Sequence, residues 1–245
     1  MSKQDYKTYF RVEPHKTKRE ISKIGSHNTD PETRKKEKHI CAELTKNNEY
    51  IIGSENDILY KQIVEHLEQR DITNEEWTKK ESKNYQEQKD IWLSEDKHVQ
   101  KNGILCYDFI ANYPGELKEV QLSDDPDAPK GFVPVDKPRY EKWKQDTINF
   151  AYEKFGKEQF VHLVLHVDET RPHFHGVFIP SYEVEKDGKI EKRLNSHKYI
   201  NGPSDLRKIL TEYAKLIGFE RGMEKRIIEN YHKKLKCLIK KCSYY

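Results

Sequence analysis

Residues 166–175, HVDETRPHFH, place three histidines and two carboxylates within a stretch too short for an ordinary helix. Just upstream, apolar and polar side chains alternate through residues 161–168, and this period of two is typical of a half-buried strand. The alternation resumes in residues 173–179 after a connection at 169–172 that has the length of a hairpin loop. We therefore predict a hairpin in which Asp168 pairs with His173, so that His166 lies opposite His175.

This hairpin would gather His166, His173 and His175 on one face of the sheet. Paired side chains have Cβ atoms roughly 4.5 to 5.5 Å apart, and three neutral imidazoles with open positions form the catalytic kind of transition-metal site. Asp168 and Glu169 suit the role of carboxylates that orient the ligands or supply a further one. The simpler alternative is a polar strand face with exposed histidines. The third histidine and the two acids favour the metal site.

The same residues resemble a family. Residues 166–180, HVDETRPHFHGVFIP, match every specified position of the motif His-x-Asp-Glu-x-x-Pro-His-x-His, the third motif of plasmid mobilisation relaxases of the MobV or Pre type. Further similar stretches are GILCYDFIANYP at 103–114, INFAYEKFGKEQF at 148–160, DGKIEKRLNS at 187–196 and DLRKILTEYAKLIGFERGM at 205–223. The resemblance covers most of residues 1–222.

The resemblance implies an α+β fold of the HUH-endonuclease kind, an antiparallel sheet flanked by helices, in one domain over residues 1–222. It also implies a relaxase that nicks one strand at a plasmid origin of transfer with manganese or magnesium, for mobilisation or recombination. The family's metal histidines fall on His166, His173 and His175, with Glu169 assisting. Residues 223–245 read as a basic amphipathic helix, which could begin the helical region that relatives use for dimerisation and membrane association.

Relaxases attach the cut strand to themselves, so a nucleophile is needed. The MobV type is thought to use the histidine of a first motif, His-Asn-x-Arg, and GSHNTD supplies His27 and Asn28 but has Asp30 at the arginine position, with Arg34 the next arginine. A tyrosine of a second family stretch is replaced in HICAEL by Ala42, and Cys41 replaces an asparagine. We therefore expect His27 to attack the phosphate through a phosphoramidate. The fallback candidates are His15 and His39.

Charge distribution indicates where DNA would bind. The net charge of +3 says little, but residues 15–39 and 221–241 are rich in basic side chains, and such patches bind phosphates by releasing counterions. A lysine-rich run alone is more often a solvated face. Beside a phosphodiester-cutting site we expect contact with single-stranded or hairpin plasmid DNA. The residues expected to make it are Asn28, Arg34, Lys35 and Lys36.

Composition sets the wider limits. Hydrophobic residues make up 34% of the 245 residues and charged residues 36%, so the core is modest and the solvated surface large. No apolar run approaches the roughly 20 residues of a membrane span, and the first residues lack a secretory pattern, so we expect a cytoplasmic protein. The four cysteines have no paired spacing and are expected to be free thiols.

Periodicity and capping signals predict the other elements. Strands are expected at 7–13, 39–44 and 49–54, a helix capped by Ser54 within 54–71, and an exposed helix at 74–90. A loop is expected at 123–138. It precedes a helix at 139–155 whose aromatic side chains are read as core rather than as a platform for bases.

Three other functions stay open. The departures at Asp30, Cys41 and Ala42 would suit a non-catalytic DNA-binding mobilisation protein. A rolling-circle replication initiator has similar histidines but takes a tyrosine from a later helix, for which Tyr199 and Tyr213 are candidates. A metal phosphoesterase acting on small substrates would need no DNA.

Overall fold

A five-stranded antiparallel sheet forms the centre of the computed structural model, which describes residues 10–34, 36–87, 103–122, 124, 126–127 and 130–218. Its strands lie in the order β1-β3-β7-β6-β2, and every neighbouring pair is antiparallel. Their bounds are β1 Phe10–His15, β2 Glu49–Ile52, β3 Cys106–Asn112, β6 Phe160–His166 and β7 His173–Phe178. The predicted strands near 7–13 and 49–54 and the central strand in 103–114 are thereby confirmed for the described residues.

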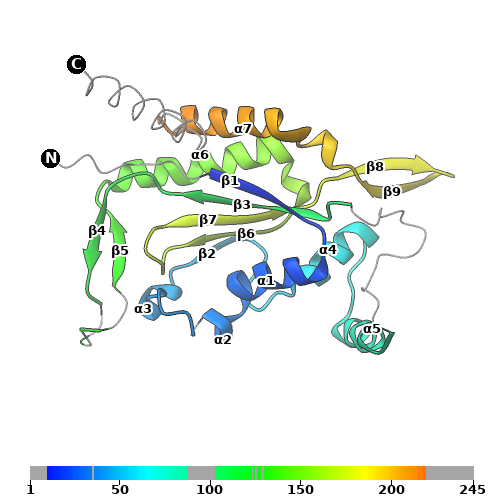
Figure 1. The fold of residues 1–245 in the computed structure, drawn as a ribbon, viewed down its shortest axis with the longest axis horizontal. Helices are drawn as coiled ribbons and strands as arrows, with labels where there is room; N and C mark the ends of the chain where they lie inside the picture. Colours follow the sequence, from blue (N-terminus) through cyan, green and yellow to red (C-terminus); the bar gives the residue numbers. More distant parts are fainter. Residues whose placement is uncertain are drawn as a thin grey trace, which may run out of the picture.

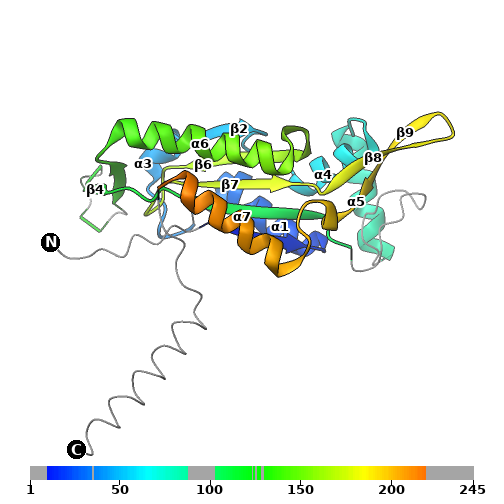
Figure 2. The same cartoon turned by 90° about the horizontal axis from the view of Figure 1, so that it is seen from above.

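Helices cover both faces of this sheet, which confirms the predicted α+β class (Figure 1). The helices α6 (Lys137–Phe155) and α7 (Gly202–Leu216) lie on one face, and Figure 2 shows them crossing over the strands. The other face carries α1 (Lys18–Thr29) and α4 (Leu59–Glu68), with the short α2 (Pro31–Arg34) and α3 (Ala42–Thr45) near one end. Helix α5 (Asn74–Glu87) follows α4, and the 3-10 turns η1 (Lys157–Gln159) and η2 (Ser196–Lys198) lie in connections.

Two small hairpins extend from opposite ends of the central sheet (Figure 1). Strands β4 (Leu117–Val120) and β5 (Gly131–Pro134) form the first, and β8 (Ser181–Lys186) and β9 (Lys189–Leu194) form the second. The first hairpin corrects the prediction of a loop over 123–138. Leu117 pairs with Pro134 and Val120 with Gly131, so part of that acidic, proline-rich segment is a strand.

The face under α6 and α7 is packed with aromatic side chains. Trp143 and Phe174 have ring centroids 5.2 Å apart, and Phe155 stacks on Phe178 at 4.2 Å. The Tyr213 hydroxyl on α7 lies 3.0 Å from Trp143 Nε1 and 2.9 Å from Thr147 Oγ1, both on α6. The predicted helix and its reading as core are confirmed, since its predicted stripe is buried: Tyr140, Trp143, Thr147, Phe150 and Ala151.

A second apolar cluster lies under α1 and α4 on the opposite face, and it includes Ile21, Leu59, Ile63 and Val177. Strands β6 and β7 are consequently buried along their whole length. The prediction of a half-buried strand is therefore wrong, and so is the alternative of a strand face with exposed histidines. The histidine face looks into the protein because α1 covers it.

Two further local predictions fail for identifiable reasons. Residues 39–44 form no strand, because the Cys41 N–H donates to the Asp168 carbonyl at 2.6 Å and α3 begins directly afterwards. Ser54 does not cap α4, which begins at Leu59, because the Asp57 carboxylate instead accepts the Ser54 N–H at 2.5 Å and closes the loop before the helix.

Several predictions concern residues that the structure leaves undescribed or only partly describes. Cys41 and Cys106 are free thiols as expected, whereas Cys237, Cys242 and the helix of 223–245 lie outside the described residues. The domain boundary near residue 222 lies there too. Among the helices of the described ranges, none combines the length and apolar character needed to cross a bilayer.

Candidate metal and nucleophile site

The histidine cluster is built on the hairpin of β6 and β7, but in a different register from the predicted one. His166 pairs with His173, and His175 lies opposite Val164. The predicted pairing of Asp168 with His173 is wrong because Asp168 leaves the ladder: its carboxylate turns to Arg34, and its carbonyl accepts the Cys41 N–H. The connection thus spans residues 167–172, yet His173 and His175 still share a face because side chains alternate.

The three imidazoles converge as the motif predicted. Ring centroids lie 5.3 Å apart for His166 and His173, 5.3 Å for His166 and His175, and 4.9 Å for His173 and His175. His27 joins them from α1, with its ring centroid 5.1 Å from that of His175 and 5.6 Å from that of His166. Four imidazoles from three elements therefore surround one small volume.

Glu169 supplies the carboxylate of this cluster. Its Oε1 lies 3.1 Å from His166 Nδ1 and 3.4 Å from His27 Nε2, and its Oε2 lies 3.8 Å from His173 Nε2. One nitrogen or oxygen each from His27, His166, Glu169 and His173 fall within 4.8 Å of one another. His175 is outside this tightest group, although its ring borders it.

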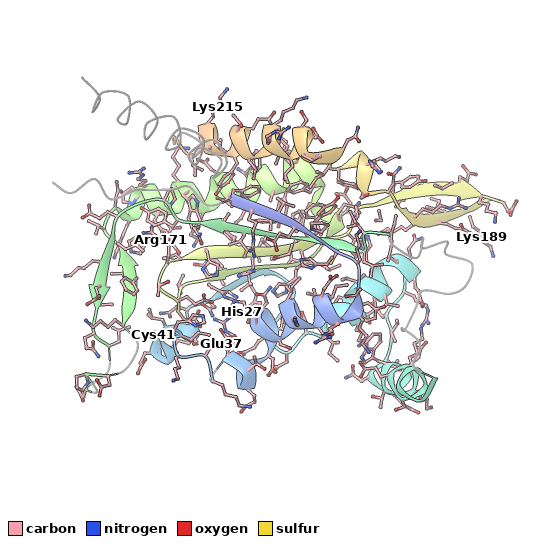
Figure 3. The ribbon with its side chains drawn as sticks, in the orientation of Figure 1. His27, Glu37, Cys41, Arg171, Lys189 and Lys215 are labelled. Carbon is pink, nitrogen blue, oxygen red and sulfur yellow. The ribbon has the colours of Figure 1, made fainter. Side chains whose placement is uncertain are left out.

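His27 lies in the last turn of α1, where a second carboxylate reaches it. Its Nδ1 is 3.3 Å from Glu37 Oε1, and Figure 3 shows the two side chains close together below the sheet. Gly25, two residues earlier, lets α1 approach α4, because a Cβ there would lie 3.3 Å from Leu59 Cβ. The helix end is thus held against the histidine face, with Glu37 on one side of the His27 ring and Glu169 on the other.

Arg34 ties these parts together from within the protein. Its Nη2 donates to both carboxylate oxygens of Asp168 at 2.7 and 2.8 Å, and its Nη1 donates to the His27 carbonyl at 2.7 Å. Asp168 also accepts from Thr45 Oγ1 at 2.8 Å and from Asn48 Nδ2 at 2.9 Å. This bidentate, buried pair fixes the end of α1 relative to the turn that carries Glu169.

Burial keeps the three histidines of the hairpin, His166, His173 and His175, neutral. It lowers the pKa of His166, His173 and His175 below the ordinary 6.5, and for His175 the nearby His173 and His27 lower it further. At neutral pH these rings hold unprotonated nitrogens, which is the form that binds metals. His166 Nε2 is moreover buried without any hydrogen-bond partner.

The pKa values of Glu169 and His27, which face these histidines, are shifted in opposite directions. Burial acts to raise the pKa of Glu169, but hydrogen bonds with His166 and His27 and the neighbouring imidazoles outweigh it and hold that pKa well below 4.5. Burial acts to lower the pKa of His27, yet the bonds and charges of Glu169 and Glu37 prevail and raise it. Both results describe an anionic centre that attracts positive charge.

These observations test whether a divalent cation fits. The donor set holds imidazoles and a carboxylate, the three hairpin histidines are neutral, and the buried nitrogens His166 Nε2 and His175 Nδ1 lack partners. Imidazoles suit zinc, copper, iron and nickel, carboxylates suit manganese and magnesium, and a set that mixes both suits a divalent metal ion. The residues present therefore fit a cation such as manganese.

The expected DNA-binding residues are placed less favourably. Asn28 is 0% and Arg34 3% exposed, so neither reaches a phosphate while α1 and α2 stay in place. Lys36 is exposed, and Lys35 lies outside the described residues. The prediction of DNA contact stays a prediction, and the structure points Arg34 toward the site instead.

Of the alternative nucleophiles, only His39 lies at the site. His39 lies at the site, with Nε2 3.6 Å from Glu169 Oε2, whereas the His15 Nε2 is buried and unpaired at the far end of β1. Tyr199 and Tyr213 belong to the aromatic cluster on the opposite face of the sheet. Neither tyrosine can approach the histidines through the sheet.

Sequence reasoning missed the polar residues that support the site. They are Glu37, Thr45, Asn48 and Asp108. Asp108 belongs to a segment read only as a central strand. Its position on the histidine face of β3 follows from the alternation of that strand, so this signal was available.

Comparison with solved structures gives the class of the fold. Two structures of the MobM relaxase domain, each bound to plasmid pMV158 oriT DNA with manganese, superpose with TM-scores of 0.55 and 0.54 at 18% and 17% identity. Both alignments cover 89% of this chain and 91% of the other. At that identity the likeness concerns the fold, which is that of a relaxase domain.

Sequence comparison finds similar proteins for part of the chain. The family model described as plasmid recombination enzyme matches residues 118–236. The plasmid recombination enzyme type 1 of Staphylococcus aureus is 31% identical over 98 residues, and the 65 kDa protein of Zymomonas mobilis is 34% identical over 89. These matches cover 38% and 35% of this chain but only 23% and 14% of the relatives. In this part of the chain the sequence is thus similar to the Pre/Mob plasmid recombination enzymes.

Proposed function

We propose that this chain is a relaxase, which nicks one strand of DNA at a plasmid origin of transfer and holds the cut strand covalently. The observation that carries the proposal is the position of His27, with its ring 5.1 Å from that of His175 and its Nε2 3.4 Å from Glu169. A nucleophile beside a cation site is what phosphoryl transfer from DNA requires. The DNA-bound, manganese-bound MobM relaxase domains support the choice of substrate and metal.

The residues proposed to hold the cation are His166, His173 and His175, with Glu169 as the carboxylate. A divalent ion bound there neutralises charge that builds on the scissile phosphate. Arg34 and Asp168 keep the turn of Glu169 against the end of α1. Positioning and electrostatics thus supply most of the catalysis.

His27 performs the covalent step. Glu37 accepts a hydrogen bond from the His27 Nδ1–H, and for attack Nε2 gives up the proton that it shares with Glu169, which leaves an Nε2 lone pair facing the phosphate. Nε2 attacks phosphorus, the N–P bond forms, and the bond from phosphorus to the 3′ oxygen breaks. The departing 3′ oxygen takes a proton from water and becomes a 3′-hydroxyl. The Nδ1 proton stays on the ring, and the Glu37 carboxylate that accepts a hydrogen bond from it offsets the positive charge of the phosphorylated imidazole.

The test compares His27→Ala and His173→Ala with the control His197→Ala, a histidine exposed on η2. Purified variants are assayed for nicking of supercoiled origin plasmid with Mn²⁺. The first two are expected to lose at least a hundredfold in nicking rate, and the control to keep the wild-type rate. Mass spectrometry of the peptide left on a nicked oligonucleotide should place the adduct on His27. Full activity of the His173 variant would refute the cation site.

A non-catalytic DNA-binding mobilisation protein is the second candidate, favoured by Asp30 at the arginine position and by Cys41 and Ala42. The contacts of Arg34 weigh against it, because this arginine reaches the His27 carbonyl despite its shifted place in the chain. Origin binding with metal affinity but no covalent adduct would establish this alternative. A tyrosine-dependent initiator is disfavoured by the placement of Tyr199 and Tyr213.

The remaining expectations accompany the proposal. A cytoplasmic location, a homodimer, and membrane contact through the helix expected at 223–245 stay predictions. A small-substrate phosphoesterase would bind no origin DNA, so a DNA-binding assay separates it from the relaxase.

A further inference from the structure

Asp108 lies behind the proposed metal site with a carboxylate that has no evident structural purpose. It belongs to β3, is 4% exposed, and its Oδ1 is buried without a hydrogen-bond partner. The Nδ1 of His175 is likewise buried and unpaired, and the two atoms face each other at 3.6 Å. A donor and an acceptor that both lack partners therefore stand slightly beyond hydrogen-bonding distance.

The order of the strands fixes which way the His175 ring points. Strand β7 lies between β3 and β6, and His175 pairs with Ile110 on one side and Val164 on the other. With Nδ1 turned toward Asp108 on β3, the other ring nitrogen points roughly the opposite way. That direction leads toward β6, where the His166 ring lies 5.3 Å from that of His175.

We propose that Asp108 is a positioning residue for the metal, accepting the Nδ1 proton of His175 so that Nε2 of His175 faces the cation. The inference rests on the metal site of the proposed function and extends it to a residue on a third strand. Histidine ligands commonly donate their second N–H to a carboxylate, which fixes the tautomer and increases ligand basicity. It also explains how His175, outside the tightest donor group, becomes a ligand.

A purely structural role for Asp108 is disfavoured by its surroundings. The charged and titratable groups around it are Arg11, His15, His27 and His162, in addition to His175. None of them satisfies Oδ1, and a buried carboxylate oxygen without a partner weakens the fold. Asp108 lowers the stability of the metal-free protein, and its presence is explained if it orients His175 in the metal-bound protein.

The experiment measures Mn²⁺ binding to the full chain by calorimetry, without DNA. Asp108→Asn is expected to weaken Mn²⁺ binding by roughly 10- to 100-fold, while the melting temperature of the metal-free protein does not fall. The matched control is Asp146→Asn on α6, where the carboxylate pairs with Lys142 on the other side of the sheet. Its Mn²⁺ affinity should equal that of the wild type.

A double-mutant cycle then tests whether Asp108 acts through His175. Asp108→Asn should have no further effect on Mn²⁺ affinity in a His175→Ala background, yet keep its full effect beside the control change Asp146→Asn. If the His175 variant binds too weakly to titrate, NMR of the zinc-loaded wild type should show a slowly exchanging His175 Nδ1 proton that Asp108→Asn abolishes.

Three results would decide against parts of this picture. Wild-type affinity in Asp108→Asn, or an undiminished effect of that change without His175, overturns the role of Asp108. A wild-type protein that binds no Mn²⁺ overturns the metal site itself, and with it the proposed function. The two failures are therefore distinguishable.

Discussion

At the scale of single residues, Asp168 decides the shape of the site. Its carboxylate receives hydrogen bonds from Arg34, Thr45 and Asn48, and its carbonyl receives one from Cys41. A residue at the end of a strand would ordinarily pair across the hairpin. These contacts instead draw it out of the ladder and into the protein, and Glu169 next to it is carried toward His27.

The first prediction concerns the partner of Asp168. Arg34→Ala should lower the free energy of unfolding by about 3 to 5 kcal/mol, because it leaves the buried Asp168 carboxylate without its counter-charge. Arg34→Lys should recover only part of this loss, since Arg34 binds Asp168 and the His27 carbonyl through two different nitrogens and lysine has only one. Chemical denaturation followed by circular dichroism measures both.

The matched control is Arg193→Ala, whose pair with Glu191 is about 40% exposed on the β8–β9 hairpin. It should change the free energy of unfolding by less than about 1 kcal/mol. Equal losses in the Arg34 and Arg193 variants would show that the buried pair does not hold the site.

At the scale of elements, α6 and α7 form one unit through the Tyr213 hydroxyl, which contacts both Trp143 and Thr147. This unit covers the aromatic face of the sheet, and the histidines lie on the other face. Strand β7 links them, since Phe174 points into the aromatic core and His173 and His175 point into the site. Packing of Phe174 in the aromatic core therefore holds the strand that carries His173 and His175 on its other face.

Tyr213→Phe tests whether the aromatic face of the sheet contributes to stability without taking part in nicking. It should cost about 1 to 3 kcal/mol of stability, because Trp143 loses a buried hydrogen-bond acceptor. The nicking rate per folded molecule should not change. The control Tyr182→Phe, on a partly exposed ring under Lys198, should alter neither. Loss of nicking in a folded Tyr213 variant would instead point to a tyrosine nucleophile.

At the scale of the whole molecule, the site joins segments that are distant in the chain. His27 comes from α1, His166 ends β6, Glu169 lies in the turn, and His173 begins β7. A cation held as proposed by His166, His173, His175 and Glu169 ties the β6–β7 hairpin to its connecting turn, directly beside His27 of the helical layer. Binding to the folded state alone stabilises it by mass action.

Saturating Mn²⁺ should therefore raise the melting temperature by several degrees, since a ligand at about 100 times its Kd adds about 2.7 kcal/mol. Because burial holds the pKa of His166, His173 and His175 below 6.5, protons compete poorly and the shift should persist at pH 6. Differential scanning fluorimetry with and without a chelator measures it. His173→Ala should show no shift, and an equal shift in that variant would place the ion elsewhere.

The periodic features of this protein could be predicted from local sequence patterns. Alternation put His173 and His175 on one face, and helical spacing identified the buried stripe of α6, because both depend on local backbone geometry. The register, in which His166 pairs with His173, and the places of Arg34 and Glu37 around the site depend instead on tertiary contacts. The bond from Arg34 to Asp168 spans 134 positions of the chain. No local pattern encodes such a contact, since it exists only after both layers have closed on the sheet.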